Sequence, residues 1–156
     1  DDLREVFVRT YRIVYRVERD PLYRKIMDTD HRAPEATAAD AITAAARQVA
    51  QTISAAAIVT FSSTGSTTLR CARERPGVPI LGLTPRANTA RRLALAWGVH
   101  SVQTEDLHSF GEMVTKAIAA ASREGFAKPG QKVVVTAGVP FGTPGATNIL
   151  RIALVQ

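Results

Sequence analysis

Residues 57–67 read Ala-Ile-Val-Thr-Phe-Ser-Ser-Thr-Gly-Ser-Thr, and this stretch decides the fold. Its apolar half, Ala57 to Phe61, is typical of a strand buried in a parallel sheet. Its polar half, 62–67, places five hydroxyl side chains around Gly65 and precedes a helical pattern. Such a turn can wrap a phosphate, because glycine permits close backbone approach and a helix N-terminus offers free N–H groups with a partial positive charge. The alternative is an ordinary helix cap, since serine and threonine are common there.

Outward from this stretch, apolar segments alternate with helical patterns along most of the chain. Strands are expected at 57–62, 78–84, 99–104, 132–137 and 149–155, and helices at 37–53, 66–75, 88–97 and 110–123. This alternation predicts an α/β fold of three layers, in which an open, mostly parallel sheet of five strands lies between helices. Right-handed crossovers bring the carboxyl ends of the first and fourth of these strands to one rim, where ligands bind in such folds.

A second loop, Gly138 to Asn148, follows the fourth expected strand. It carries three glycines and two prolines, which is typical of a shaped loop, and its threonines and Phe141 are able to contact a sugar or a base. The alternative is a plain surface connection before an edge strand. Because both loops follow strands that end at one rim, 62–67 and 138–148 are predicted to be the walls of one pocket.

The N-terminal region is predicted to be separate from this domain. Apolar residues recur along 3–17 as in an amphipathic helix, 21–26 fits a short second helix, and the polar segment 28–34 is typical of a linker. We therefore expect an N-terminal helical segment and linker at 1–34 and an α/β domain at 35–156.

Composition places the chain among ordinary soluble proteins and excludes several classes. With 156 residues, 46% hydrophobic and 22% charged, it suits one globular domain with a sizeable core. No apolar run is long enough to cross a bilayer, the first residues lack a signal-peptide core, and the single cysteine fits a reducing compartment, so a cytoplasmic location is expected. The net charge of +6 comes from scattered arginines with only 6% aromatic residues, so neither nucleic acid nor a membrane is a predicted partner.

Familiar catalytic motifs are absent from the sequence. It has no P-loop, no dinucleotide-binding glycine fingerprint and no nucleophile elbow. None of His31, His100 and His108 has a partner at a metal-ligand spacing, and no acid, base and nucleophile converge. No catalytic residue, metal site or cofactor is therefore predicted. Cys71 is expected in the core, and Glu105–Asp106 is interpreted as a cap of the following helix.

Several segments, in their order along the chain, resemble the C-terminal domain of pyruvate kinase. They are VERDPLY at 17–23, IVTFSSTGSTTLR at 58–70, CARERPGVPILGLTP at 71–85, NTARRL at 88–93 and KPGQKVVVTAGVPFGTPGATNILRI at 128–152. The resemblance implies that the last strand is antiparallel at the sheet edge and that the chain is a regulatory domain rather than the catalytic barrel. Mg²⁺ and K⁺ are then expected only in the catalytic domain, and the chain alone is expected to be inactive.

In this family the domain commonly binds an allosteric sugar phosphate or nucleotide. By the resemblance, the effector phosphate would be bound by Ser62, Ser63, Thr64, Gly65, Ser66 and Thr67. The effector loop would comprise Gly138, Val139, Pro140, Phe141, Gly142, Thr143, Pro144 and Gly145. Relatives that respond to fructose 1,6-bisphosphate can carry an arginine for its second phosphate where Met113 stands here, with Lys116 one turn on. Because Ser66 is also uncharged, a monophosphate such as glucose 6-phosphate, ribose 5-phosphate or AMP is expected.

The resemblance also implies subunit contacts, since full-length relatives are tetramers in which these domains meet across a two-fold axis. A homo-oligomer is therefore expected, with a dimer formed at the edge strand 149–155. In relatives the first segment is a helix leaving the barrel. Here 1–16 is more apolar and aromatic, so it is expected to pack elsewhere, for example against a second copy.

Three functions stay open at this point. The first is an effector-binding regulatory domain of pyruvate kinase. The second is a free-standing dimerisation or interaction module that kept the fold without ligand binding. The third is a small enzyme, such as a phosphoesterase or an isomerase, that uses the same pocket.

Overall fold

The computed structural model describes residues 3–8, 11–16, 35–141, 143 and 145–156. Contacts divide the chain into two units, Asp1–Ala33 and Pro34–Gln156, of which the second holds the five-stranded sheet. The short helix expected at 21–26 and the linker expected at 28–34 lie outside the described residues.

In the N-terminal unit the expected helix over 3–17 is wrong. Strands β1 (Leu3–Val8) and β2 (Tyr11–Arg16) form an antiparallel pair, with Val8 opposite Tyr11. The apolar spacing fitted a helix, but the residue types favour strands, because β-branched and aromatic side chains suit an extended backbone better than a helix. These residues are Val6, Phe7, Val8, Tyr11, Ile13, Val14 and Tyr15.

The second unit is the expected α/β domain. Its strands are β3 (Ala57–Phe61), β4 (Ile80–Thr84), β5 (Val99–Gln103), β6 (Lys132–Gly138) and β7 (Thr147–Leu154). Their order across the sheet is β5-β4-β3-β6-β7, with β7 antiparallel to β6 and all other neighbours parallel. The predicted mostly parallel sheet with an antiparallel edge strand is confirmed, and β3 lies at its centre.

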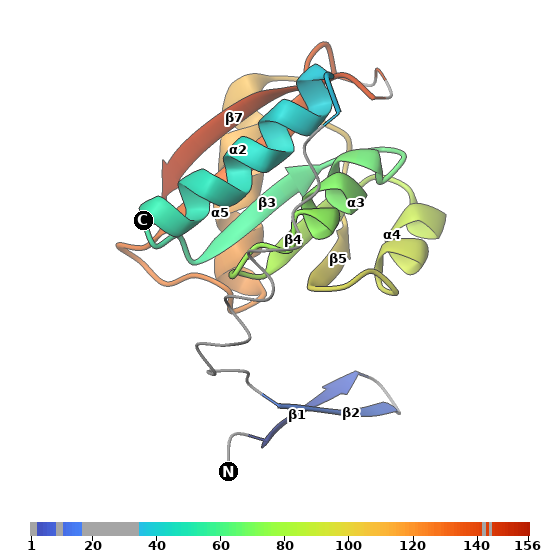
Figure 1. The fold of residues 1–156 in the computed structure, drawn as a ribbon, viewed down its shortest axis with the longest axis vertical. Coiled ribbons are helices and arrows are strands. Elements are labelled where there is room, and N and C mark those ends of the chain that lie inside the picture. Colours follow the sequence, from blue (N-terminus) through green and yellow to red (C-terminus); the bar gives the residue numbers. More distant parts are fainter. Residues whose placement is uncertain (1–2, 9–10, 17–34, 142, 144) are drawn as a thin grey trace. The chain divides into compact units, whose positions relative to one another are not determined.

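Helices cover both faces of this sheet (Figure 1). They are α2 (Ala38–Thr52), α3 (Ser66–Arg73), α4 (Ala87–Leu93) and α5 (Phe110–Arg123). On one face α2 and α3 pack against Ile58, Ile80 and Val134 through alanines and Cys71. On the other face α5 packs against the alternate residues of the same strands, such as Val59 and Val135. The three-layer arrangement is confirmed, and it follows from strands that are apolar on both sides.

The helix ends show which local signals were decisive. Thr37 caps α2 and Ser109 caps α5, each with its side-chain oxygen accepting a backbone N–H three residues on. Gly125 follows α5 with a positive φ of 76°, a conformation that favours glycine. In contrast, Arg86 occupies the N-cap position of α4, and its side chain makes no capping hydrogen bond.

The end of α4 also differs from the expectation, because the helix stops at Leu93 rather than near Trp97. Beyond Leu93, hydrogen bonds from Leu95 N to Arg92 O and from Ala96 N to Leu93 O tighten the backbone into turns. In the described part of the chain, no helix combines the length and the apolar character that a bilayer span requires.

Candidate functional site: a pocket at the carboxyl rim of the sheet

The segment 62–67, which we call the hydroxyl turn, joins the central strand β3 to α3. Its Gly65 has a φ of 82°, and no side chain caps α3. The alternative interpretation, that these serines and threonines serve as a helix cap, therefore does not describe what they do. Thr64 Oγ1 lies 3.2 Å from Ser66 Oγ, and among the described residues no side chain forms a capping hydrogen bond with α3. As far as the described residues show, the first-turn N–H groups of α3 are available to an acceptor from outside the chain.

Helix α4 holds this turn from the side. Thr89 Oγ1 donates to the Ser63 carbonyl at 3.0 Å, and the Arg92 guanidinium donates to the Thr64 carbonyl. A Cβ at Gly65 would lie 3.1 Å from side-chain atoms of both Thr89 and Leu93. The close packing explains why a glycine stands at this point, and it brings the Arg92 cation beside the hydroxyl turn. Sequence reasoning missed Arg92, since a side chain 28 residues from the turn gives no local signal.

A buried ion pair anchors α3 itself. Asp40, on the first turn of α2, is fully buried and faces Arg70 and Arg73 of α3, with Arg73 Nη2 at 2.8 Å from Asp40 Oδ1. Burial alone would raise the pKa of Asp40, but hydrogen bonds from the two arginines outweigh it and hold the pKa below its ordinary value. The carboxylate therefore stays charged and ties the helix that follows the hydroxyl turn to α2.

Across the rim lies the glycine-rich loop, residues 138–147. Its base is closed by Asn148, whose side chain accepts from Val139 N at 2.9 Å and donates to Val139 O at 2.6 Å. A Cβ at Gly138 would lie 2.7 Å from the carbonyl oxygen of Ala146, so the two ends of the loop approach as closely as only glycine allows. Phe141 packs against the core cluster on the α5 side of the sheet.

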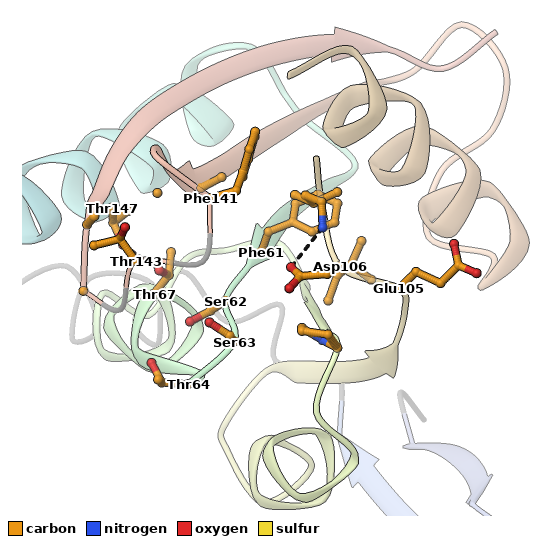
Figure 2. Close-up of a pocket in the computed structure, with 17 residues that line it drawn as sticks. Phe61, Ser62, Ser63, Thr64, Thr67, Glu105, Asp106, Phe141, Thr143 and Thr147 are labelled. Atoms are coloured by element: carbon orange, nitrogen blue, oxygen red, sulfur yellow. Dashed lines mark hydrogen bonds between the residues drawn. The ribbon is translucent and has the colours of Figure 1, made fainter. Parts of the chain in front are cut away.

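The two segments line one pocket (Figure 2). From the predicted residues, the lining includes Ser62, Ser63, Thr64, Thr67, Gly138, Phe141, Thr143 and Gly145. Four others, Gly65, Ser66, Val139 and Pro140, belong to the same segments but are not among the lining residues, and Gly142 and Pro144 lie outside the described residues. The buried hydroxyls of Thr67 and Thr147 meet at 2.5 Å and join the first turn of α3 to the start of β7.

The size of the pocket limits what it holds in this conformation. Its enclosed space is about 50 Å³. A buried water molecule needs about 10–15 Å³ of such space, so there is room for a phosphate group or a few waters but not for a whole sugar phosphate. A larger ligand would extend into the mouth of the pocket or displace the glycine-rich loop.

A third wall was not recognised from the sequence. Glu105 and Asp106, which we call the acidic wall, line the pocket after β5. They were interpreted as a cap of the next helix, but Ser109 is that cap and Glu112 accepts from His108 N at 2.9 Å. Their position at the rim could have been inferred from topology, since β5 is parallel to β4 and ends at the same edge.

The two residues considered for a second phosphate both lie elsewhere. Met113 belongs to α5, and its side chain is fully buried in the core. Lys116 Nζ lies 2.8 Å from Glu112 and 3.4 Å from Glu105, and it donates to the Asp106 carbonyl at 3.2 Å. Lys116 therefore holds the acidic wall from the side facing α5 and is not among the residues that line the pocket.

Comparison with known proteins identifies the family. A family model described as "Pyruvate kinase, alpha/beta domain" matches residues 40–153. The chain belongs to the pyruvate kinase family. Pyruvate kinase of Methylorubrum extorquens is 49% identical over 144 residues, which cover 92% of this chain and 30% of that protein. Pyruvate kinases of Agrobacterium vitis and Geobacillus stearothermophilus are 38% and 35% identical over 90% and 94% of this chain.

The expected resemblance to the C-terminal domain of pyruvate kinase is confirmed by these matches. The chain spans less than a third of the length of these relatives, 30%, 30% and 25% respectively. The match to the family model begins within the α/β unit, at residue 40, so the hydroxyl turn, the acidic wall and the glycine-rich loop all fall inside it.

Proposed function

We propose that this α/β domain is the regulatory domain of a pyruvate kinase and that it binds a phosphorylated effector in the rim pocket. The whole enzyme would transfer a phosphoryl group from phosphoenolpyruvate to ADP in glycolysis, whereas this domain would bind and not catalyse. The observation that carries the proposal is the hydroxyl turn, which offers side-chain hydroxyls and uncapped first-turn N–H groups to one small cavity.

Two further features support an anionic ligand at the turn. The N-terminus of α3 carries the partial positive charge of the helix dipole, and the Arg92 guanidinium lies beside Thr64. Charge-assisted hydrogen bonds to a phosphate contribute roughly 1.5–3 kcal/mol each, so a few of them would dominate the affinity.

Regulation would follow from differential binding. An effector that favours one position of the glycine-rich loop shifts the domain toward that conformation by no more than its difference in affinity for the two. Because Thr147 of that loop is the first residue of the edge strand β7, a movement of the loop would change the position of the start of β7.

Calorimetric titration of the full 156-residue chain tests this proposal. The titrants are glucose 6-phosphate, ribose 5-phosphate and AMP, of which at least one is expected to bind. Thr64→Glu places a carboxylate at the turn and is expected to weaken that binding by about 100-fold or more, because juxtaposed like charges cost several kcal/mol.

Thr64→Ser is the matched control for this variant. It keeps the hydroxyl and is expected to retain affinity within about threefold, and thermal unfolding should show both variants folded. Binding of none of the three titrants, or equal binding by the glutamate variant, would contradict the proposal. Turnover of any titrant would instead favour the small enzyme.

A second candidate, a dimerisation module, is favoured by the sheet edge. Strand β7 is an edge strand, and its Ile152 and Leu154 are 46% and 53% exposed. Exposed edges with apolar side chains pair readily with another strand. Sedimentation velocity of the chain with and without the phosphorylated titrants separates the two functions, since a module without a ligand would dimerise and leave all titrants unbound.

A further inference from the structure

The charges that line the pocket are of one sign. Among the lining residues that the structure describes, the charged side chains are Glu105 and Asp106, and none is lysine or arginine. Two cations, Lys116 and Arg123, line a neighbouring groove along α5 that Glu105 and Asp106 also border. A ligand therefore meets hydroxyls and a helix N-terminus on one side of the pocket and carboxylates on the other.

The two carboxylates of the acidic wall are not equivalent. Glu105 has a side chain that is 92% exposed, pairs with Lys116 and points away from the other lining residues in Figure 2. Asp106 instead lies among those residues, and its Oδ1 accepts from Leu107 N at 2.9 Å, which orients the carboxylate. Within the described part of the chain, Asp106 Oδ2 makes no hydrogen bond to protein. One oxygen of Asp106 is therefore held and the other is open to a ligand.

The backbone that carries Asp106 is itself held. Lys116 Nζ donates to the Asp106 carbonyl and pairs with Glu105 and Glu112, so α5 fastens the acidic wall from outside the pocket. Lys116 is committed to these oxygens, and among the described residues no lysine or arginine forms an ion pair with the Asp106 carboxylate. The acceptor character of Asp106 is thus available to a bound molecule.

We propose that Asp106 determines which phosphorylated ligands this pocket accepts. Its carboxylate accepts hydrogen bonds from hydroxyl groups of a ligand whose single phosphate lies at the hydroxyl turn, and it repels a ligand that carries a second phosphate at the far end. A carboxylate is an acceptor only, so it suits the O–H donors of a polyhydroxylated carbon chain and opposes another anion. The inference rests on the proposed function, because it assigns the far end of the same site.

Paired titrations with fructose 6-phosphate and fructose 1,6-bisphosphate test Asp106, since these probes differ by one phosphate. The unmodified chain is expected to prefer the monophosphate by about tenfold or more. Asp106→Asn keeps the shape of the side chain and the acceptor for Leu107 N but removes the charge. It is expected to lower that preference by about tenfold, partly through weaker binding of the monophosphate.

Glu105→Gln is the matched control. It removes the same charge from the neighbouring residue, whose side chain points outward, and it is expected to leave the preference unchanged. An unchanged preference in Asp106→Asn, an equal change in both variants, or tighter binding of the bisphosphate by the unmodified chain would each overturn the role of Asp106.

These outcomes are distinct from failure of the proposed function. If neither probe nor inorganic phosphate binds the unmodified chain, or if the bound monophosphate is insensitive to Thr64→Glu, the turn is not a phosphate site and both proposals fall. If the monophosphate binds and is lost in Thr64→Glu while Asp106→Asn has no effect, the proposed function stands and only the inference fails.

Discussion

The hydroxyl turn and the glycine-rich loop face each other across the pocket, but they are held in different ways. The turn is hydrogen-bonded from α4 through Thr89 and Arg92, and the helix that follows it is tied to α2 through Asp40. In the described part of the loop, the side-chain hydrogen bonds gather at its base, at Thr147 and Asn148. A rigid wall suits the recognition of a fixed group, and a wall held at its ends suits movement around ligands of varying shape.

The largest effect is expected from removing the ion pair that holds α3, the helix that follows the hydroxyl turn. Asp40→Asn leaves Arg70 and Arg73 of α3 without their buried counter-charge and is expected to lower the free energy of unfolding by about 3 kcal/mol. Urea denaturation at neutral pH measures this loss. Glu105→Gln removes one carboxylate from an exposed pair, so it should cost less than about 1 kcal/mol.

The effect of Asp40→Asn also depends on pH in a defined direction. The pKa of Asp40 is lowered in the folded chain, so its carboxylate stabilises the fold above the ordinary value of 3.8, and this stabilisation is lost as the pH falls through the folded value. The stability difference between the two chains should therefore be largest at neutral pH and shrink below pH 3.8. A difference that grows on acidification would contradict the assignment.

A smaller effect is expected from releasing the loop. Asn148→Ala removes both hydrogen bonds to Val139 and is expected to cost about 1 kcal/mol of unfolding free energy. Faster amide hydrogen exchange at Val139, with unchanged exchange in α3, would show that the loop opens independently of the turn. Asn148→Asp keeps the acceptor for Val139 N, so its unfolding free energy and its exchange rate at Val139 should fall between those of the unmodified chain and those of Asn148→Ala. Equal acceleration of exchange in α3 would mean that the two walls move as one.

The smallest effect is expected at Cys71, a buried thiol of α3 whose reactivity shows whether that helix stays packed. Burial raises the pKa of this α3 thiol to about 12, so little thiolate forms near pH 8. A thiol reagent is expected to leave the folded chain unmodified over hours, to label Asn148→Ala as slowly, and to label Asp40→Asn faster. Rapid labelling of the unmodified chain would show that α3 is not held as described.

The fold of the α/β unit was predictable because its signals are local. Apolar runs marked the five strands, and Thr37 and Gly125 marked the start of α2 and the end of α5 through contacts within a few residues. The cap of α5 was wrongly assigned to Glu105–Asp106 and is Ser109. Another local signal was misjudged. The helix expected over 3–17 is a strand pair, since apolar spacing alone did not weigh β-branched and aromatic residues against a helix.

The candidate site was predictable in part for the same reason. Both loops followed strands whose ends topology brings together, so their meeting in one pocket could be expected. Arg92 could not be found this way, because it reaches the turn from another helix. Asp106 follows β5 and could have been placed at the rim by the same topology, but it was interpreted as a helix cap. That an effector phosphate binds at Ser62–Thr67, that the chain forms oligomers and that it resides in the cytoplasm remain predictions.

The contact between the Thr67 and Thr147 hydroxyls has a directional consequence. Each hydroxyl owns one proton, so one oxygen donates to the other and the partner's proton is free to point elsewhere. When an anion accepts a hydrogen bond from the Thr67 hydroxyl, Thr147 must be the donor in the bond between the two threonines. Binding of an anion at the hydroxyl turn would then reverse the direction of this hydrogen bond. The reversal would carry the effect of binding to Thr147, the first residue of β7, without displacing any heavy atom.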